Sequence, residues 1–223
     1  MGSDIKGSTI FLEFYGLPGC GKSTISHLVA EELRRQGKTV KEPTYDTDHR
    51  YSPSVRKGIK LLRLIIYAFL FPSKYRALSK VIIANGYAGA NMLSQAANIA
   101  PKLWEYDHAR ADYVVFDEGL TQSAISLVNK DGSSSENEKN LYELCKRRRV
   151  RKFYIRVSPE IALSRMAGRD KHDSRIEKIR DETEKVKLMR EIEALCESAT
   201  LDFIVDAATK EESVGKIMMR INQ

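Results

Sequence analysis

The sequence is poor in cysteine and in long apolar runs. Its three cysteines, Cys20, Cys145 and Cys196, are widely spaced and odd in number, a pattern that indicates neither a disulfide framework nor a zinc site. The longest uncharged apolar run, Leu64 to Phe71, is far shorter than the roughly 20 residues that cross a bilayer. Residues 1–8 are polar and lack the apolar core of a signal peptide. We therefore expect a cytoplasmic protein with no membrane partner.

The composition is otherwise that of an ordinary folded protein, with 42% hydrophobic and 30% charged residues. A chain of 223 residues can bury a sizeable α/β core but is short for two typical domains, so we expect a single domain over residues 1–223. The net charge of +7 is concentrated in residues 140–190, which hold 16 basic and 8 acidic residues. A basic region of this kind indicates nucleic acid, membrane lipid or a small phosphorylated ligand as partner.

Apolar segments predict about five strands that alternate with helices. The predicted strands are residues 9–15, 38–42, 113–116, 152–157 and 201–206. Such alternation predicts an α/β fold with a parallel sheet covered by helices on both faces. Between the second and third strands, residues 44–53 are polar and predict a loop, and residues 75–103 predict a long, mostly helical stretch.

A phosphate-binding motif follows the first strand. Residues 16–23 (GLPGCGKS) match the pattern G-x-x-x-x-G-K-[ST] between a strand and an amphipathic helix, which is the context that this motif requires. Glycines let backbone amides turn inward around phosphate oxygens, and the helix N-terminus favours the same anion. Lys22 is expected to contact the β- and γ-phosphates of ATP, and the Ser23 hydroxyl to bind Mg²⁺. The residues expected to bind the nucleotide here are Gly16, Gly19, Cys20, Gly21, Lys22, Ser23 and Thr24.

A pair of acidic residues follows the third strand. Tyr113 to Phe116 are apolar, as expected for a strand buried on both faces, and Asp117 and Glu118 come directly after them. A carboxylate at the end of a neighbouring strand is well placed to hold Mg²⁺, so Asp117 joins Ser23 as an expected metal ligand. Glu118 has two alternative roles: contact with a water or substrate hydroxyl, or a structural acid at a helix N-terminus.

Several motifs, taken in order along the chain, resemble two kinase families. They are the phosphate-binding loop, Glu42-Pro43 after the second strand, Asp117 after the third, and residues 157–175 (VSPEIALSRMAGRDKHDSR). Together they resemble thymidylate kinase and the deoxynucleoside kinases over nearly the whole chain. The resemblance implies a three-layer P-loop kinase fold of about five parallel strands flanked by helices, with a mobile arginine-bearing lid at about residues 165–178.

The resemblance also implies roles for individual residues. Glu42 would be the base that accepts the proton of a sugar hydroxyl. Arg165 and Arg169 would contact ATP phosphates and stabilise charge in the transition state, with Arg175 as a further candidate. Arginine suits this role because the planar guanidinium group matches the geometry of phosphoryl oxygens. A solvated loop with scattered charges is the alternative for the lid segment.

The expected acceptor-binding region, about residues 44–110, departs from both families. Glu118 stands where both carry an arginine. No arginine or lysine lies between Lys80 and Lys102, where thymidylate kinases carry an arginine for the acceptor phosphate. The candidates for acceptor contacts, each with an ordinary solvated helix position as its alternative, are Gln95, Arg50, Arg56 and Lys57.

These patterns predict an ATP-dependent kinase that transfers the γ-phosphoryl group to a nucleoside or to a nucleoside monophosphate-like small molecule. The alternative is a P-loop ATPase or switch protein that associates with nucleic acid through Lys146 to Lys152 (KRRRVRK). No aromatic residues are interleaved there for base stacking, which disfavours nucleic acid and favours the cationic end of a helix. The long apolar helices predicted between residues 55 and 103 could form a homodimer interface.

Overall fold

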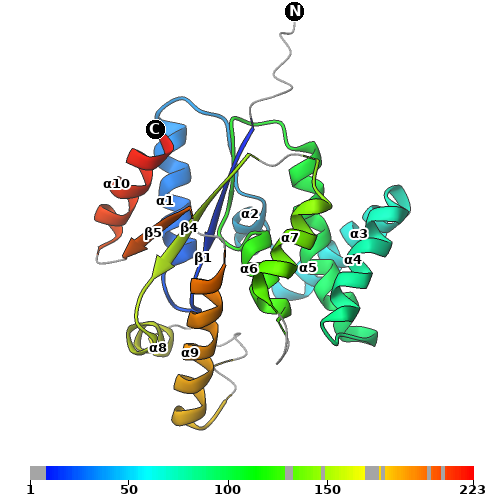
Figure 1. The fold of residues 1–223 in the computed structure, drawn as a ribbon. Coiled ribbons are helices and arrows are strands. Elements are labelled where there is room, and N and C mark those ends of the chain that lie inside the picture. The colour runs from blue at the N-terminus through cyan, green and yellow to red at the C-terminus, as the bar shows by residue number, and fades with distance from the viewer. Residues whose placement is uncertain are drawn as a thin grey trace, which may run out of the picture.

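The computed structural model describes residues 9–128, 133–146, 149–168, 176, 179–199, 202–206 and 209–223, apart from the side chains of Asp48 and His49. Within these residues, parallel strands form one five-stranded sheet in the order β2-β3-β1-β4-β5 (Figure 1). The strands are β1 Ile10–Tyr15, β2 Val40–Lys41, β3 Tyr113–Phe116, β4 Val150–Arg156 and β5 Phe203–Asp206. The predicted parallel α/β sheet is therefore confirmed.

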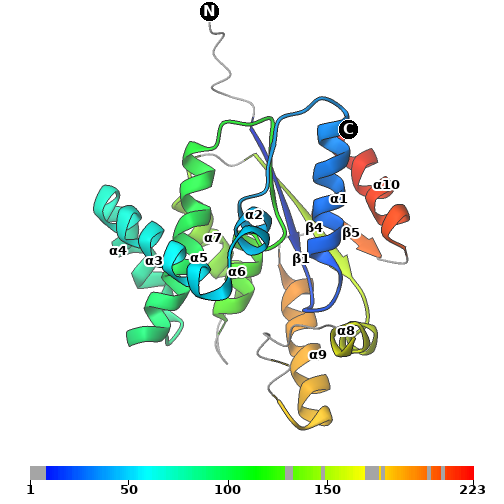
Figure 2. The same cartoon turned by 180° about the vertical axis from the view of Figure 1, so that it is seen from behind.

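Helices cover both faces of this sheet (Figures 1 and 2). Those among the described residues are α1 Lys22–Arg35, α2 Pro43–Arg50, α3 Pro53–Leu70, α4 Pro72–Ala84, α5 Gly89–His108, α6 Leu120–Leu127, α7 Ser134–Glu143, α8 Pro159–Ala167, α9 Glu182–Ser198 and α10 Lys210–Ile221. In both views α3 and α4 lie at the outer edge of the molecule, on the side away from α10. No helix within the described ranges is long and apolar enough to cross a membrane.

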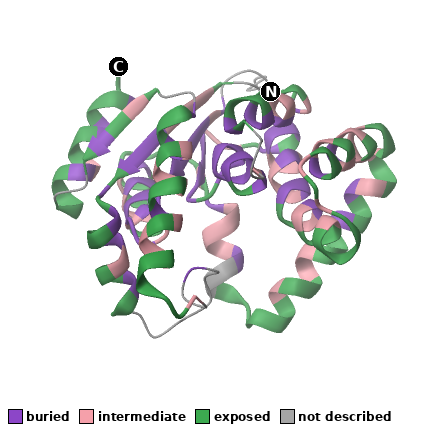
Figure 3. Ribbon diagram, turned by 60° about the horizontal axis from the view of Figure 1, so that its bottom comes forward, coloured by how far each residue is buried: buried purple, intermediate pink, exposed green. Residues whose placement is uncertain are grey.

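Alternating side chains of the strands pack into two cores, one on each face of the sheet. Leu12 and Phe14 of β1 are buried with α1 and α10, whereas Phe11, which directly precedes Leu12, is buried with α3 to α7. In Figure 3 the strands are mostly buried, while the outer surfaces of the helices are exposed. This burial on both faces explains why the strand segments are apolar runs.

The region between β2 and β3 differs from the sequence prediction at two places. Residues 44–53, predicted as a loop, largely form helix α2. Pro43 occupies the first turn, where its missing N–H is tolerated, and the Thr47 hydroxyl donates to the Pro43 carbonyl at 2.8 Å. The long helical stretch is divided into α4 and α5 at Gly86, whose φ of 81° lies in the left-handed region that ends helices.

Helix α6 was not predicted from the sequence. It follows β3 directly, and seven of its eight residues are buried. A helix that is buried on nearly all sides lacks the apolar periodicity by which a surface helix is recognised. The position of α6 is important for the site, because it begins three residues after Asp117.

The sheet topology brings the predicted motifs to one edge. β1 and β3 are parallel neighbours, with Glu13 in register with Phe116. The phosphate-binding loop after β1 and the Asp117-Glu118 pair after β3 therefore leave the sheet side by side, at the carboxyl edge where α/β proteins bind ligands.

Candidate active site

The phosphate-binding loop packs tightly against β4 and α8. Gly16 has a φ of 150°, and a Cβ added to it would lie 2.5 Å from the Ile155 carbonyl oxygen. Gly19 has a φ of 87°, and a Cβ there would overlap the Ala162 carbonyl oxygen. Only glycine fits these positions, and the resulting loop leads into α1, whose N-cap makes no side-chain hydrogen bond. The first amides of α1 are thus free of a side-chain cap and can bind an anion.

Lys22 at the start of α1 forms an ion pair with Glu118. The Lys22 Nζ lies 3.5 Å from the Glu118 Oε1, and the lysine side chain is only 9% exposed. Burial alone would lower the pKa of Lys22, but Glu118, Cys20 and Asp117 outweigh burial and raise it. Burial alone would raise the pKa of Glu118, but Lys22 and Lys102 outweigh it and lower that pKa. Both groups are therefore charged at neutral pH.

Asp117 has a buried carboxylate oxygen whose surroundings suit a metal ligand. Its Oδ1 is buried, with no hydrogen-bond partner among the described residues. Burial and the neighbouring Glu118 raise the pKa of Asp117, while a hydrogen bond with the Ser23 side chain opposes this shift. A Mg²⁺ ion would satisfy the unpaired oxygen, so Asp117 and Ser23 fit the expected metal site. The described residues contain no group of three metal-binding side chains, so phosphate oxygens and water would complete the coordination.

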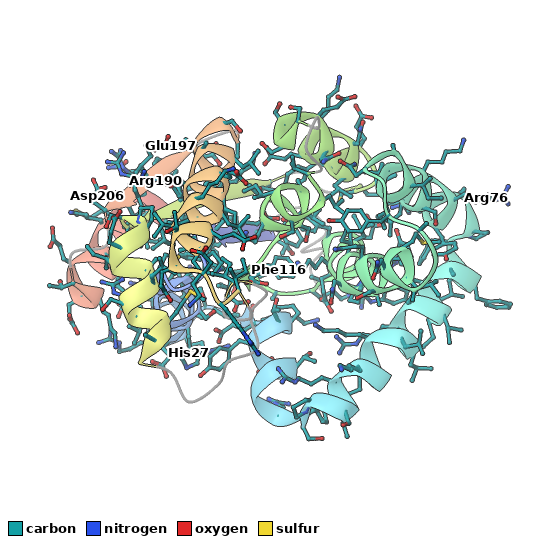
Figure 4. All side chains as sticks on the ribbon, turned by 90° about the horizontal axis from the view of Figure 1, so that it is seen from below. His27, Arg76, Phe116, Arg190, Glu197 and Asp206 are labelled. Atoms are coloured by element: carbon teal, nitrogen blue, oxygen red, sulfur yellow. The ribbon has the colours of Figure 1, made fainter. Side chains whose placement is uncertain are left out.

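Glu42 points toward helix α1. Its carboxylate lies 2.6 Å from the Arg34 Nη1 and 3.0 Å from the His27 Nδ1, and the residue is only 2% exposed. His27, labelled in Figure 4, also stacks on Tyr45 of α2 at 3.9 Å between ring centroids. In the role that the resemblance implies, the Glu42 carboxylate would face the acceptor. In the structure this carboxylate contacts Arg34 and His27 of α1.

A cavity of about 360 Å³ lies beside Glu118. Its walls come from α2, α3, α5 and α6. Of these helices, α2, α3 and α5 belong to the region in which acceptor binding was expected. Phe116, labelled in Figure 4, lines it at the end of β3. The other lining residues are Pro43, Thr44, Thr47, Lys60, Arg63, Gln95, Ala97, Asn98, Ile99, Pro101, Lys102, Glu118, Gln122, Ser123 and Ser126. Gln95 is thus placed at the cavity, whereas Arg50, Arg56, Lys57 and Glu42 are not among its lining residues.

Three cations at this cavity were not identified from the sequence. Lys102 of α5 donates to the Ser123 hydroxyl at 2.7 Å and to the Gly119 carbonyl at 3.3 Å. Lys60 of α3 donates to the Asn98 amide oxygen at 3.1 Å, and Arg63 lies one helical turn further along α3. No local motif marks these residues, because their common position depends on how α3, α5 and α6 pack.

Helix α6 links the acceptor cavity to the phosphate-binding loop. Its Gln122 lines the cavity and accepts a hydrogen bond from the Gly16 amide at 3.0 Å. The N-terminus of α6 is fixed by the buried Glu13 carboxylate of β1, which accepts from the Leu120 amide at 2.8 Å and the Thr121 amide at 2.9 Å. Glu13 is therefore a positioning residue, and as a charged residue within a buried strand it was a signal that sequence analysis overlooked.

Within the predicted lid, the structure describes residues 165–168 and 176. The Arg165 Nη1 of α8 donates to the Cys20 carbonyl at 3.2 Å, so this arginine lies against the phosphate-binding loop. Arg169 and Arg175 lie outside the described residues, as do Arg147 and Arg148 of the basic run. Lys152, at the end of that run, turns inward and pairs with the buried Glu138 at 2.9 Å, so part of the run stabilises the fold.

Comparison with known proteins reveals similarity in structure only. No family model and no curated protein matches the chain. Deoxyadenosine kinase from M. mycoides with dCMP and dCDP bound is similar, with a TM-score of 0.51, 18% identity and coverage of 96% of this chain and 98% of that one. Shikimate kinase from Acinetobacter baumannii in complex with shikimate has a TM-score of 0.54 and 15% identity, covering 97% of this chain and 93% of that one.

A shikimate kinase from Bacteroides thetaiotaomicron is similar as well, with a TM-score of 0.52, 10% identity and coverage of 96% of this chain and 99% of that one. These similarities extend over nearly the full length of each chain. The chain therefore has the P-loop kinase fold, as the sequence resemblance implied.

Proposed function

We propose that this protein is an ATP-dependent phosphotransferase that phosphorylates a nucleoside or nucleotide-like small molecule. The observation that carries the proposal is that Glu118 connects the two sites. It lines the 360 Å³ cavity and forms an ion pair with Lys22 of the phosphate-binding loop. A cavity of this size suits a small acceptor. The P-loop kinase fold supports phosphoryl transfer as the reaction.

The nucleotide would be held by the loop and the first turn of α1. Backbone amides from Gly21 to Thr24 would surround the β-phosphate, and Lys22 would leave Glu118 to contact the β- and γ-phosphates. Ser23 and Asp117 would hold Mg²⁺, which neutralises charge on the phosphates when it is bound. Arg165, already against the loop, and Arg169 would contact the transferred phosphoryl group.

Of the two candidate carboxylates for the acceptor, the geometry favours Glu118. Glu118 lines the cavity and its side chain is 51% exposed, whereas Glu42 is buried against Arg34 and His27. Glu42 would reach an acceptor only after leaving both partners. We therefore propose that Glu118 contacts the acceptor and that Glu42 holds α2 and the segment before it against α1.

Other parts of the proposal concern organisation and location. We propose one kinase domain over residues 1–223, with its acceptor region at about 44–110 and its lid at about 165–178. The three cysteines are buried and free, which supports the reducing environment of the cytoplasm. A homodimer through α3 is also proposed, because large apolar side chains are exposed along one side of that helix.

The test is ADP release by the purified chain with ATP and Mg²⁺, with and without each member of a panel of nucleosides, nucleotides and sugars. We expect ADP formation to require an acceptor and to equal the amount of phosphorylated product. ADP release that is equal without an acceptor would contradict a transferase. Strong stimulation by DNA or RNA instead would favour the nucleic-acid-associated ATPase.

A further inference from the structure

The acceptor cavity is lined by charges of both signs. Glu118 lies next to Lys22, where the γ-phosphoryl group would arrive. Lys60 and Arg63 of α3 line another part of the same cavity. Helix α5 connects the two, with Asn98 in contact with Lys60 and, one turn later, Lys102 in contact with α6. An acceptor that fills the cavity would therefore meet both a carboxylate and cations.

The Glu118 carboxylate favours a hydroxyl as the reacting group. A carboxylate accepts a hydrogen bond from a hydroxyl, but it repels the negative charge of a phosphate. Lys102 does not reverse this preference, because its ammonium group donates to the Ser123 hydroxyl and the Gly119 carbonyl. Lys22 does not reverse it either, since in the proposed reaction it binds the phosphates of ATP.

The two α3 cations that line the cavity favour an anion. Lys60 and Arg63 are separated by three positions on α3, so their side chains lie on the same side of the helix. Lys60 donates to the neutral Asn98 amide, and Arg63 has no hydrogen-bond or ion-pair partner within the described part of the chain. No acidic residue other than Glu118 lines the cavity among the described residues. Two cations without a carboxylate partner form a suitable site for a carboxylate or a phosphate group.

We propose that the acceptor is an alcohol that also carries an anionic group, with its hydroxyl at Glu118 and its anion between Lys60 and Arg63. This inference rests on the proposed kinase function and specifies its substrate class. The hydroxyl oxygen bonds to the γ-phosphorus of ATP as the bond from that phosphorus to the β–γ bridging oxygen breaks. ADP leaves, the hydroxyl proton passes to the Glu118 carboxylate, and the product is a phosphate monoester.

The binding test uses pairs of compounds that differ only by the anion. Ribose 5-phosphate and ribose form one pair, and gluconate and glucose form the other. Each compound is titrated calorimetrically into protein saturated with a non-hydrolysable ATP analogue and Mg²⁺, so that the phosphate-binding loop is already filled. We expect the anionic member of at least one pair to bind at least tenfold more tightly than its neutral partner, and the two pairs distinguish a phosphate from a carboxylate.

Matched variants assign the anion to its site. Arg63→Gln and Lys60→Gln should each remove this preference and leave the affinity for the ATP analogue unchanged. Arg76→Gln is the control, because Arg76 is exposed on α4 and does not line the cavity (Figure 4). Equal binding of neutral and anionic partners in the wild type, or a preference that survives both cavity variants, would overturn the inference.

The chemical test identifies the bond formed with an anionic acceptor. Phosphorus-31 NMR of the reaction mixture distinguishes a phosphate monoester from a phosphoanhydride. We expect a monoester even with a nucleoside monophosphate as acceptor, which offers both a hydroxyl and a phosphate. A phosphoanhydride, or faster turnover of neutral alcohols, would overturn the inference and leave the kinase function intact. A chain that neither binds the ATP analogue nor releases ADP would instead contradict the proposed function itself.

Discussion

The Lys22 ammonium group lies 3.5 Å from the Glu118 carboxylate, which joins the phosphate-binding loop to the acceptor cavity. In the proposed reaction Lys22 contacts the ATP phosphates, so nucleotide binding would break this pair and release Glu118 toward the acceptor. The pair thus couples the filling of one site to the charge presented to the other. The variants below separate the roles of the residues around it.

Replacing Lys22 with alanine should remove transition-state stabilisation without unfolding the protein. We expect kcat/KM to fall by about 10²- to 10³-fold, or about 3–4 kcal/mol, because a positioned cation at the transferred phosphoryl group is lost. Steady-state ADP release measures the change, and circular dichroism checks the fold. Lys80→Ala, on the exposed surface of α4, is the control. Near-normal turnover by Lys22→Ala would contradict the assignment.

Asp117→Asn should stabilise the protein in the absence of metal and remove its response to Mg²⁺. The buried Oδ1 of Asp117 has no hydrogen-bond partner among the described residues, so its charge is poorly compensated without a cation. We expect Tm in EDTA to rise by a few degrees, consistent with about 1 kcal/mol. Addition of Mg²⁺ and an ATP analogue should raise the Tm of the wild type, and the variant should lose this rise. A variant that keeps this Mg²⁺-dependent rise would show that Asp117 is not a metal ligand.

Glu42→Gln and Glu118→Gln should have different effects. Loss of the Glu42 charge weakens its ion pair with Arg34, whose side chain is 40% exposed, so we expect the free energy of unfolding to fall by about 1 kcal/mol. Glu118→Gln should lower kcat by at least tenfold with little effect on ATP affinity, since it removes the carboxylate that faces the acceptor. Urea unfolding and steady-state kinetics of both variants test this. If only Glu42→Gln lowers kcat, Glu42 is the base, as the sequence resemblance implied.

Gly119→Ala and Gly58→Ala should change stability in opposite directions. A Cβ on Gly119 would overlap the carboxylate of Glu13, which fixes the N-terminus of α6. We expect this variant to lose about 2 kcal/mol or more of stability. Gly58 lies in α3 with no atom within 4 Å of an added Cβ, so alanine there should add about 0.5–1 kcal/mol. Chemical denaturation measures both, and a neutral Gly119→Ala would contradict this role of Glu13.

The exposed side of α3 should mediate dimerisation. Large apolar side chains there repeat at helical spacing, at Leu61, Leu62, Ile65, Ile66, Phe69 and Leu70. We expect light scattering to give about twice the chain mass of 25.3 kDa. Phe69→Lys, at a residue that is 84% exposed, should give a monomer, whereas Met219→Lys on α10 should not. A wild-type monomer at high concentration would contradict the dimer.

Much of the fold and part of the site could be predicted from the sequence. The strand segments were recognisable because burial on both faces requires apolar runs, as in β3. Gly16, Gly19 and Lys22 belong to one contiguous motif whose geometry is local, and in the structure they lie between the end of β1 and the start of α1. Helix α6 was missed, because a helix buried on nearly all sides has no apolar stripe.

The sequence by itself therefore determined the α/β class and the phosphate-binding loop, both of which depend on neighbouring residues in the chain. Only the tertiary structure decided which charged side chains surround the acceptor cavity. Glu42 directly precedes Pro43, which lines that cavity, but the Glu42 carboxylate pairs with Arg34 of α1. Lys60 and Lys102 are 42 positions apart in the sequence, yet both line the cavity. Side-chain charge is a property of the sequence, but the partner that each charge meets depends on the packing of helices that are distant along the chain.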